Sequence, residues 1–126
     1  FSFELVVDEV MVNNFAELTG DKNPLHLDDN YAQKTEFGQP IVHGMLLGSF
    51  FSTLVGMLCP GKKALYLSQD LRFRNPLKFG KTVIVAGVVV AKYDAAKIIE
   101  IKTSVKDKRG IIVVDGLAKV KVRHES

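Results

Sequence analysis

A short segment near the N-terminus carries side chains that can do acid/base chemistry. It reads Gly20-Asp21-Lys22-Asn23-Pro24-Leu25-His26. Asp and His are common general acids and bases, and Pro24 fixes its own φ angle and pushes Asn23 toward an extended conformation. The carboxylate of Asp21 and the imidazole of His26 can therefore be aimed at one point, a geometry that suits the activation of a water molecule.

The same segment also has a purely structural interpretation. A glycine is a common C-cap of a helix, and Asp and Asn side chains often accept hydrogen bonds from nearby backbone in turns. Gly20, Asp21 and Asn23 are thus also what an ordinary loop after a helix contains. On this segment alone, both interpretations stay open.

A second segment, residues 39–52, begins a long apolar helix. It reads Gln-Pro-Ile-Val-His-Gly-Met-Leu-Leu-Gly-Ser-Phe-Phe-Ser and has Gly44 at the start of the helix. A glycine at this place can present a bare backbone N–H to an oxyanion, with the helix dipole behind it.

Together the two segments resemble the MaoC-like dehydratases, and most closely the R-specific enoyl-CoA hydratases of the hot-dog superfamily. The first segment has the family's Asp-x-Asn-Pro-x-His motif, and the second has its Pro-Ile-Val-His-Gly-Met-Leu helix start. The resemblance continues through Pro60-Gly61, Tyr66-Leu67 and Leu71-Arg72-Phe73, so it covers essentially the whole chain.

The resemblance implies the reversible, R-specific hydration of a trans-2-enoyl-CoA to the (R)-3-hydroxyacyl-CoA. Asp21 would be the base, and His26 would position the water and assist proton transfer. Asn23 matches the amide of the family motif, where it either orients the catalytic pair or only forms the turn. Gly44 would donate its N–H to the thioester oxygen; without the resemblance we would assign it only the start of the helix. We expect partial burial of Asp21, because a carboxylate fully exposed to water is a weak base.

Two further residues of the apolar helix need an interpretation. Ser52 lies eight residues after Gly44, about two turns along roughly the same face, and matches a substrate-binding serine of the family. The alternative is that its hydroxyl, like those of Ser49 and Thr53, bonds to a carbonyl one turn earlier. His43 receives no catalytic role, since a histidine at a helix start is often packed or capping.

The first half of the chain predicts a strand and three helices. Phe1, Phe3 and Leu5 alternate with Ser2, Glu4 and Val6, as in a half-buried strand. Asp8 can cap a helix that runs toward Leu18 and ends at Gly20. Asp28 can cap a short helix over residues 29–34, and the apolar helix spans about residues 43–58.

The second half predicts strands joined by turns. In residues 64–74, one face would carry Leu65, Leu67, Gln69, Leu71 and Phe73. Three more strands follow at residues 82–93, 97–106 and 111–123. Strands joined by tight turns pair antiparallel, and only the apolar helix can cover the sheet. We therefore predict an α+β hot-dog fold, with at least five antiparallel strands wrapped around a long central helix, as one domain over residues 1–126.

Composition excludes several classes of protein. With 126 residues, 47% of them hydrophobic, the chain can build a core without disulfides or metal. The single Cys59 excludes an internal disulfide, and no Cys/His cluster has metal-ligand spacing in the sequence, so we expect no metal. The net charge of +3 comes without a dense Lys/Arg block, which argues against nucleic acid. The uncharged run over residues 45–59 is shorter than the roughly 20 residues of a membrane-spanning helix.

The resemblance also implies a homodimer whose neighbouring subunit helps to form the site, and no cofactor except coenzyme A as part of the substrate. We expect a cytoplasmic location, or an organelle if an N-terminal targeting segment has been removed, because the chain begins at Phe1. The alternatives are an acyl-carrier-protein dehydratase, a hot-dog acyl-CoA thioesterase and a non-catalytic acyl-thioester-binding subunit. The hydratase motif argues against the thioesterase, and the presence of Asp21, His26 and Gly44 argues against the non-catalytic subunit.

Overall fold

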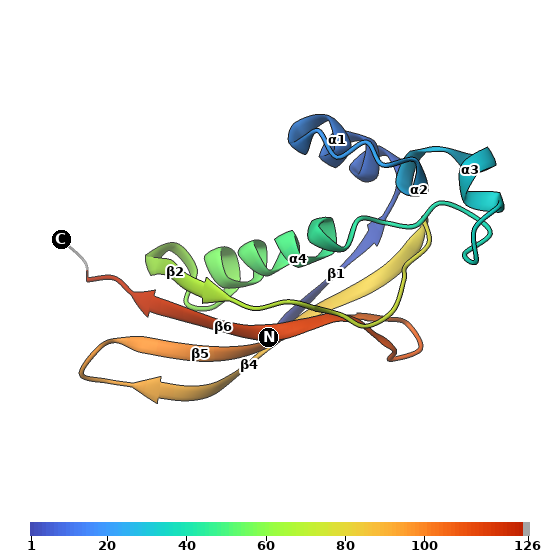
Figure 1. Ribbon diagram of the computed structural model, residues 1–126. Helices are drawn as coiled ribbons and strands as arrows, with labels where there is room; N and C mark the ends of the chain where they lie inside the picture. Colours follow the sequence, from blue (N-terminus) through green and yellow to red (C-terminus); the bar gives the residue numbers. More distant parts are fainter. Residues whose placement is uncertain (125–126) are drawn as a thin grey trace.

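An antiparallel sheet of six strands curves around one central helix (Figure 1). The computed structural model describes residues 1–124. The strands are β1 (Ser2–Val7), β2 (Ala64–Gln69), β3 (Arg72–Phe73), β4 (Lys81–Tyr93), β5 (Ile98–Asp107) and β6 (Ile112–Val122). Their order in the sheet is β1-β4-β5-β6-β2, and the short β3 also pairs with β6. This arrangement confirms the predicted hot-dog fold.

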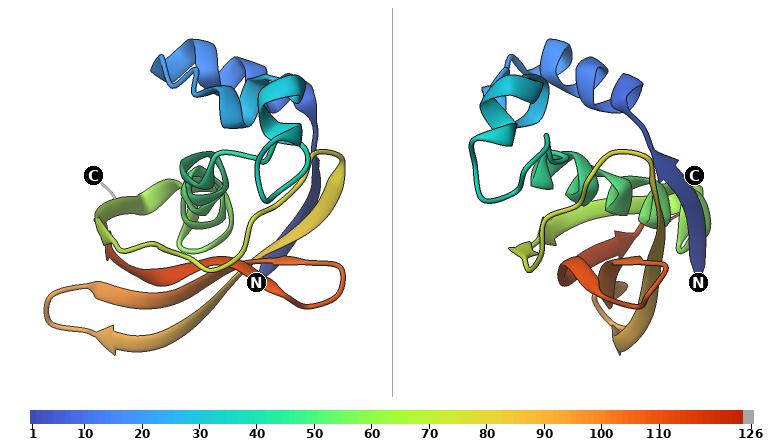
Figure 2. Two further views of the ribbon diagram at one scale, coloured as in Figure 1. Left: turned by 45° about the vertical axis from the view of Figure 1, so that its right-hand side comes forward. Right: turned by 90° about the vertical axis from the view of Figure 1, so that its right-hand side faces the viewer.

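The central helix is α4 (Gly44–Thr53), and it continues as a π-helical turn over Leu54–Leu58. Its buried side chains Leu47, Phe51 and Leu54 pack against valines of β4, β5 and β6. A second, smaller core cluster joins Val55 to Ile101 and to residues of β6. The two views of Figure 2 show α4 lying in the hollow of the curved sheet. Burial of this apolar surface is what holds helix and sheet together.

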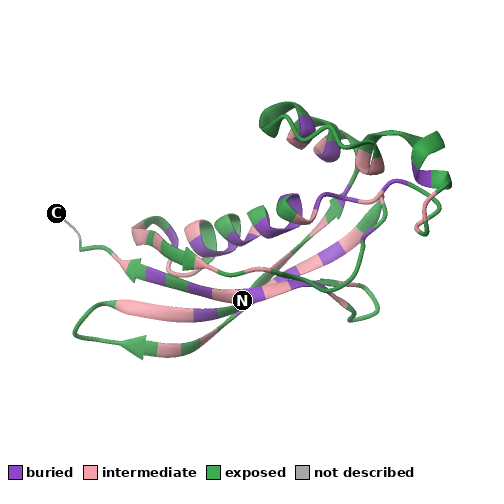
Figure 3. Cartoon of the chain, in the orientation of Figure 1, coloured by how far each residue is buried: buried purple, intermediate pink, exposed green. Residues whose placement is uncertain are grey.

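The segment between β1 and α4 lies above the central helix, away from the sheet (Figure 1). It contains α1 (Glu9–Thr19), α2 (Pro24–Leu27) and α3 (Asp29–Gln33), and we call it the α1–α3 segment (residues 8–34). Most of it is exposed, and its buried residues are Val12, Ala16 and Ala32 (Figure 3). Each helix begins at a side chain that accepts a backbone N–H: Asp8, Asn23 or Asp28. Local caps therefore define this segment more than burial does.

The predicted elements of the first half are confirmed with small changes. Asp8 and Asp28 cap their helices as expected, and Gly20 ends α1 with a left-handed φ of 79°. The long apolar helix is not one regular α-helix, since its last five residues are π-helical. Residues 24–27, expected as loop, form the one-turn helix α2 because Pro24 suits a first helical position and Asn23 caps it.

The prediction that Gln69 shares a face with Leu65 and Leu67 is wrong. Leu65 and Leu67 are about half exposed, at 48% and 49%, whereas Tyr66 packs against the second core cluster. A register shift between Tyr66 and Ser68 breaks the alternation, so Gln69 lies on the same face as Tyr66. The Tyr66 hydroxyl donates a hydrogen bond to Gln69 Oε1 at 2.7 Å. A β-bulge moves every later side chain to the other face, and binary alternation in the sequence does not reveal it.

The described residues contain no helix that is both long and apolar enough to cross a membrane.

Candidate active site

Local hydrogen bonds shape the loop that carries the Asp-x-Asn-Pro-x-His motif. The N–H of Gly20 donates to Ala16 O at 2.8 Å and closes α1. Asp21 Oδ1 accepts from the N–H of Asn23 at 3.3 Å, and Asn23 Oδ1 accepts from the N–H of Leu25 at 3.0 Å. The loop thus turns straight from α1 into α2, which carries His26.

His26 is held by the strand-like segment that precedes α4. Its Nδ1 donates to the carbonyl of Ile41 at 2.7 Å, and Ile41 N–H donates to Leu25 O at 3.2 Å. Because a carbonyl oxygen only accepts, Nδ1 must carry the proton. In the neutral ring, Nε2 of His26 is then left with a lone pair that can accept a proton or bind a water.

His43, directly before α4, is the buried neighbour of this pair. Its exposed fraction is 2%, and its ring stacks on that of His26 with centroids 3.9 Å apart and planes at 26°. Its Nε2 donates to the backbone carbonyl of Asp21 at 3.0 Å, while its buried Nδ1 has no hydrogen-bond partner. Phe15 packs on the ring at a centroid distance of 4.9 Å.

Burial lowers the pKa of His43 from its ordinary value of 6.5, and the neighbouring His26 also lowers it. The hydrogen bond to the Asp21 carbonyl and the Asp21 carboxylate act in the opposite direction but do not reverse the shift. His43 is therefore neutral at neutral pH. A neutral His43 ring adds no positive charge next to His26 and Asp21.

Asp21, His26 and His43 form a cluster of potential ligands. One carboxylate oxygen and one nitrogen of each imidazole all lie within 4.8 Å of one another. The sequence did not show this cluster, because the second histidine comes 17 positions after the first. One nitrogen of each ring is already bound to a carbonyl, and the remaining nitrogen of His43 is buried. This donor set does not fit a catalytic metal, which needs lone pairs directed at a common open point.

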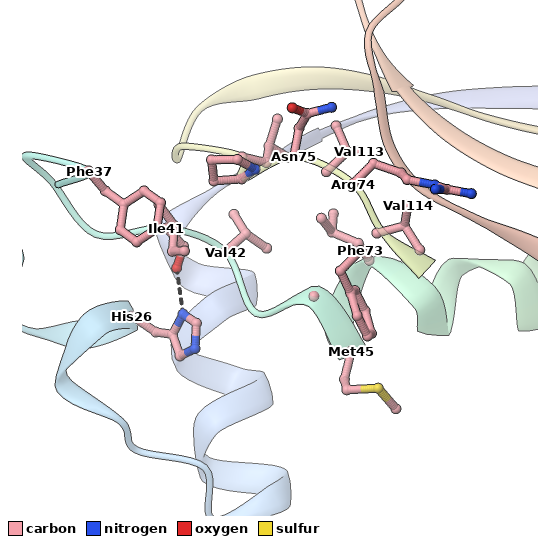
Figure 4. A pocket seen from close by; sticks show the side chains of 14 residues that line it. His26, Phe37, Ile41, Val42, Met45, Phe73, Arg74, Asn75, Val113 and Val114 are labelled. Carbon is pink, nitrogen blue, oxygen red and sulfur yellow. Dashed lines mark hydrogen bonds between the residues drawn. The ribbon is translucent and has the colours of Figure 1, made fainter. Parts of the chain in front are cut away.

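An apolar cavity of about 400 Å³ opens beside His26 (Figure 4). His26 and Phe37 line it from the α1–α3 side, and Gly44 and Met45 from the start of α4. Its other walls come from the end of β3, from the β3–β4 connection and from β6: Phe73, Arg74, Asn75, Pro76, Leu77, Val113 and Val114. Ile41, Val42 and Leu47 complete the lining. The cavity is suited to an apolar group that has one polar, reactive end at His26.

Gly44 is the first residue of α4 and lines this cavity. The carbonyl of His43 accepts from Leu46 and Leu47, and within residues 1–124 no acceptor is found for the Gly44 N–H. A Cβ at Gly44 would come within 2.6 Å of the Phe73 ring, so a side chain here would force that ring to move away from α4. Gly48, one turn later, similarly admits Leu71. Gly44 thus combines a tight contact with an unsatisfied donor at a helix N-terminus.

A family model described as a MaoC like domain matches residues 1–110. This chain belongs to the MaoC-like family. It is 44% identical over 108 residues to an (R)-specific enoyl-CoA hydratase of Aeromonas caviae, which is 86% of this chain and 81% of that protein. It is 38% identical to a 3-hydroxybutyryl-CoA dehydratase of Methylorubrum extorquens, over 88% of this chain and 70% of the relative. A solved (R)-hydratase from A. caviae superposes with a TM-score of 0.94 and 39% identity, covering 97% of this chain and 92% of that structure.

Within this MaoC-like domain, the predicted site residues divide into three groups. Asp21 and His26 lie close together, and Gly44 lines the same cavity as His26. Asn23 acts as the cap of α2 through its Oδ1, the turn-forming alternative. Ser52 is exposed and does not line the cavity within this single chain. Ser49 does bond to the Leu46 carbonyl, at 2.6 Å, as the structural alternative for the serines of α4 supposed.

Two features of the site differ from what the sequence led us to expect. Asp21 is exposed in the single chain, so the expected partial burial is not provided by its own subunit. His43 was assigned no catalytic role, but it contacts both members of the proposed pair. The sequence could have indicated a role for His43, because it directly precedes Gly44, the residue proposed for the oxyanion.

Proposed function

We propose that this protein is an R-specific enoyl-CoA hydratase that adds water across the double bond of a trans-2-enoyl-CoA and catalyses the reverse dehydration. The observation that carries the proposal is the convergence of Asp21 and His26 beside an apolar cavity that also contains the unsatisfied N–H of Gly44. This provides a proton acceptor, a water-binding imidazole and an oxyanion donor around one reacting group.

Asp21 acts as the base in this mechanism. A water molecule lies between the Asp21 carboxylate and Nε2 of His26, whose Nδ1 is fixed on the Ile41 carbonyl. As the water oxygen attacks C3, Asp21 takes its proton, and a proton from the same pair reaches C2. Both protons move on one face of the alkene because the Asp21 carboxylate and the His26 imidazole lie within 4.8 Å of each other.

Gly44 stabilises the charge that this attack creates. Negative charge moves onto the thioester oxygen as an enolate, and the Gly44 N–H donates to that oxygen at the start of α4. A donor of this kind is worth about 10²–10³ in rate, because it binds the transition state more strongly than the substrate.

His43 is a positioning residue that does not touch the substrate. Its Nε2–H fixes the backbone carbonyl of Asp21, and its ring fixes the plane of His26 by stacking. Since both catalytic groups depend on one buried ring, a shift of that ring moves them together. The lowered pKa of His43 keeps its own charge out of the pair.

A second copy of the chain completes the site. The outward face of α4 is exposed and carries no charge, with Met45, Ser49, Ser52 and Met57 along it. The edge strand β2 likewise exposes Leu65 and Leu67. Apolar surface of this kind is typical of an interface. Dimerisation through this surface would also cover Asp21 and bring Ser52 toward an active site of the dimer. Light scattering at the assay concentration tests this part of the proposal, and a fully active monomer would contradict it.

The substrate and location follow the same reasoning. We propose coenzyme A as the carrier and no further cofactor, because the mechanism needs only acid/base groups and a backbone donor. A cytoplasmic location remains a prediction from the sequence. The main alternative is a dehydratase for thioesters of acyl carrier protein, which would use the same catalytic pair.

The decisive experiment follows the loss of enoyl-thioester absorbance with crotonyl-CoA and with a longer 2-enoyl-CoA. We expect rapid conversion to the R alcohol by wild type, and a loss of about 10²–10⁴ in kcat for Asp21→Asn. Asp21 is exposed, so Asp21→Asn should keep the wild-type melting temperature and thereby exclude misfolding. Release of free thiol instead of hydration would identify a thioesterase, and no reaction of folded wild type with any CoA thioester would reject the proposal.

A further inference from the structure

A second cavity, of about 470 Å³, adjoins the apolar cavity of the site. The two share Pro76 and Leu77, which lie in the connection between β3 and β4. The residues that form the second cavity belong to this connection, to the start of β4 and to the turn between β5 and β6. Figure 1 shows these segments at one end of the sheet. The second cavity lies at the same end of the sheet as the catalytic residues.

The side chains that line the second cavity are strongly basic. They include four cations and a single carboxylate: Lys78, Lys81, Lys108, Arg109 and Asp107. Asp107 is already neutralised, since Arg109 donates to it from Nη2 at 2.8 Å and from Nε at 3.1 Å. Two backbone N–H groups also donate to its other oxygen. The carboxylate therefore does not compete for an anionic ligand.

Lys78 and Lys81 are the cations free to bind such a ligand. Lys108 has an exposed ion pair with Glu4 at 3.4 Å, and Arg109 has its pair with Asp107. For Lys78 and Lys81, no ion pair is found in the described part of the chain. We call the cavity with these residues the basic cavity.

We propose that the basic cavity binds the phosphate groups of the coenzyme A nucleotide while the enoyl thioester reacts at His26 and Gly44. This inference rests on the proposed function, whose substrate carries a pyrophosphate and a 3′-phosphate on a long pantetheine arm. The arm leaves the apolar cavity over the exposed Pro76 and places the phosphates between Lys78 and Lys81. Lysine ammonium groups bind phosphate as point charges and need no fixed geometry.

A comparison within the chain supports this position. Another basic cavity, lined by Lys92, Lys97 and Arg123 among others, lies at the β4–β5 turn. It shares no residue with the apolar cavity, so a phosphate bound there is not adjacent to the reacting thioester. Its lysines provide a matched control for charge alone.

The phosphates are far from the reacting carbons, so their contribution is the same in the ground state and the transition state. Such uniform binding changes KM and leaves kcat unaltered. The cations are exposed, so added salt screens the attraction. A substrate that ends at pantetheine lacks the nucleotide phosphates and is insensitive to both changes.

The test compares crotonyl-CoA with crotonyl-pantetheine in wild type, in Lys78→Glu/Lys81→Glu and in the control Lys92→Glu/Lys97→Glu. For crotonyl-CoA, we expect the first variant to raise KM about tenfold or more at low salt with kcat unchanged. For crotonyl-pantetheine, the same variant should match wild type, and the control variant should match it for both substrates. Adenosine 3′,5′-bisphosphate should inhibit wild type competitively and the first variant at least about tenfold more weakly.

Three results would overturn the proposal. In the first, both substrates lose activity equally in Lys78→Glu/Lys81→Glu, which would place the effect on the fold or the catalytic groups. In the second, the control variant raises KM as much as Lys78→Glu/Lys81→Glu does, which would show that the change in net charge alone causes the rise. In the third, KM for crotonyl-CoA stays unchanged while turnover of a crotonyl thioester of acyl carrier protein falls, which would make the cavity a docking site for an acidic protein.

The proposed function can fail separately from this inference. If wild type hydrates neither crotonyl substrate, calorimetric titration with adenosine 3′,5′-bisphosphate still tests the basic cavity. Binding to wild type that is lost in Lys78→Glu/Lys81→Glu supports a nucleotide-phosphate site, whereas no binding to wild type rejects it.

Discussion

The sheet with α4 and the α1–α3 segment are held in place by different forces. In the first region, a continuous apolar core of buried side chains such as Phe51, Leu54 and Val85 joins helix and strands. In the second, three buried residues, three helix caps and the hydrogen bonds of two histidines hold a largely exposed segment. The proposed acid/base pair, Asp21 and His26, belongs to the second region, whereas the proposed oxyanion donor Gly44 and most of the cavity wall belong to the first or lie next to it. We therefore expect substitutions in the core of the first region to lower mainly the free energy of unfolding, and substitutions around the acid/base pair of the second to lower mainly turnover.

The largest effect on stability is expected for Phe51→Ala. Phe51 is 1% exposed in the main core, and its truncation leaves a cavity between α4 and the sheet. We expect a loss of about 3–5 kcal/mol in the free energy of unfolding, measured by urea denaturation. Leu18→Ala on α1 serves as control, because Leu18 is 84% exposed and should change stability by less than about 0.5 kcal/mol. A loss for Phe51→Ala no larger than that of the control would contradict the contrast between the regions.

Substitution of His43 should show the opposite behaviour, with most of the loss in turnover. His43→Phe keeps a ring against His26 but cannot donate to Asp21 O, whereas His43→Asn keeps a donor and loses the stacking. We expect kcat to fall by about 10–100-fold in each, with little change in KM, since a small displacement of the catalytic pair is enough for such a loss. The pH profile of kcat should also shift, because the environment of His26 changes.

For His43, the contrary result is easily recognised. If both variants lose stability but the folded fraction keeps the wild-type kcat and pH profile, His43 is only a packed residue. In that case, comparison of the two variants shows whether the stacking or the hydrogen bond contributes more to stability.

Asn23→Ala tests the weaker forces that hold the α1–α3 segment. Asn23 Oδ1 caps α2 through the N–H of Leu25, and loss of such a cap costs about 0.5–2 kcal/mol. Asn23→Ser can still cap and should retain most of the stability. If kcat is unchanged in the folded Ala variant, Asn23 has only the turn-forming role; a fall in kcat for the Ser variant despite full stability would indicate that its amide orients the water.

The smallest effect is the dependence of stability on pH through His43. Its pKa is lowered in the folded state, so below about pH 6.5 the unfolded chain binds more protons than the folded one. Stability from this group is complete above that value and falls as the pH decreases toward the lower, folded-state pKa. Urea denaturation at about pH 7.5 and 5.5 should show a smaller pH effect for His43→Phe than for wild type. Equal pH effects in both proteins would show that His43 does not contribute to the pH dependence of stability.

Most of the fold was predictable from the sequence because it depends on local chemistry and periodicity. Asp8, Gly20 and Asp28 each mark a helix end through their own backbone preferences or side-chain bonds. The apolar run after Gly44 and the alternating strands after residue 80 predict the helix and the sheet that must cover it. The Asp21–His26 pair was predictable because both residues lie in one short motif.

The remaining features depend on contacts between segments far apart in the chain. The position of Gln69 on the face of Tyr66 follows from a bulge against β6, and the stacking of His43 on His26 follows from the path of the chain between α3 and α4. The basic cavity joins the start of β4 to the β5–β6 turn, about 25 residues later in the chain. The sequence alone thus determined most of the elements, the family resemblance and the closeness of Asp21 to His26, the proposed catalytic pair, since these are set by neighbouring residues. Only the tertiary structure decided which ring supports that pair and which cations adjoin its cavity, because side-chain packing and the electrostatic field depend on distance in space.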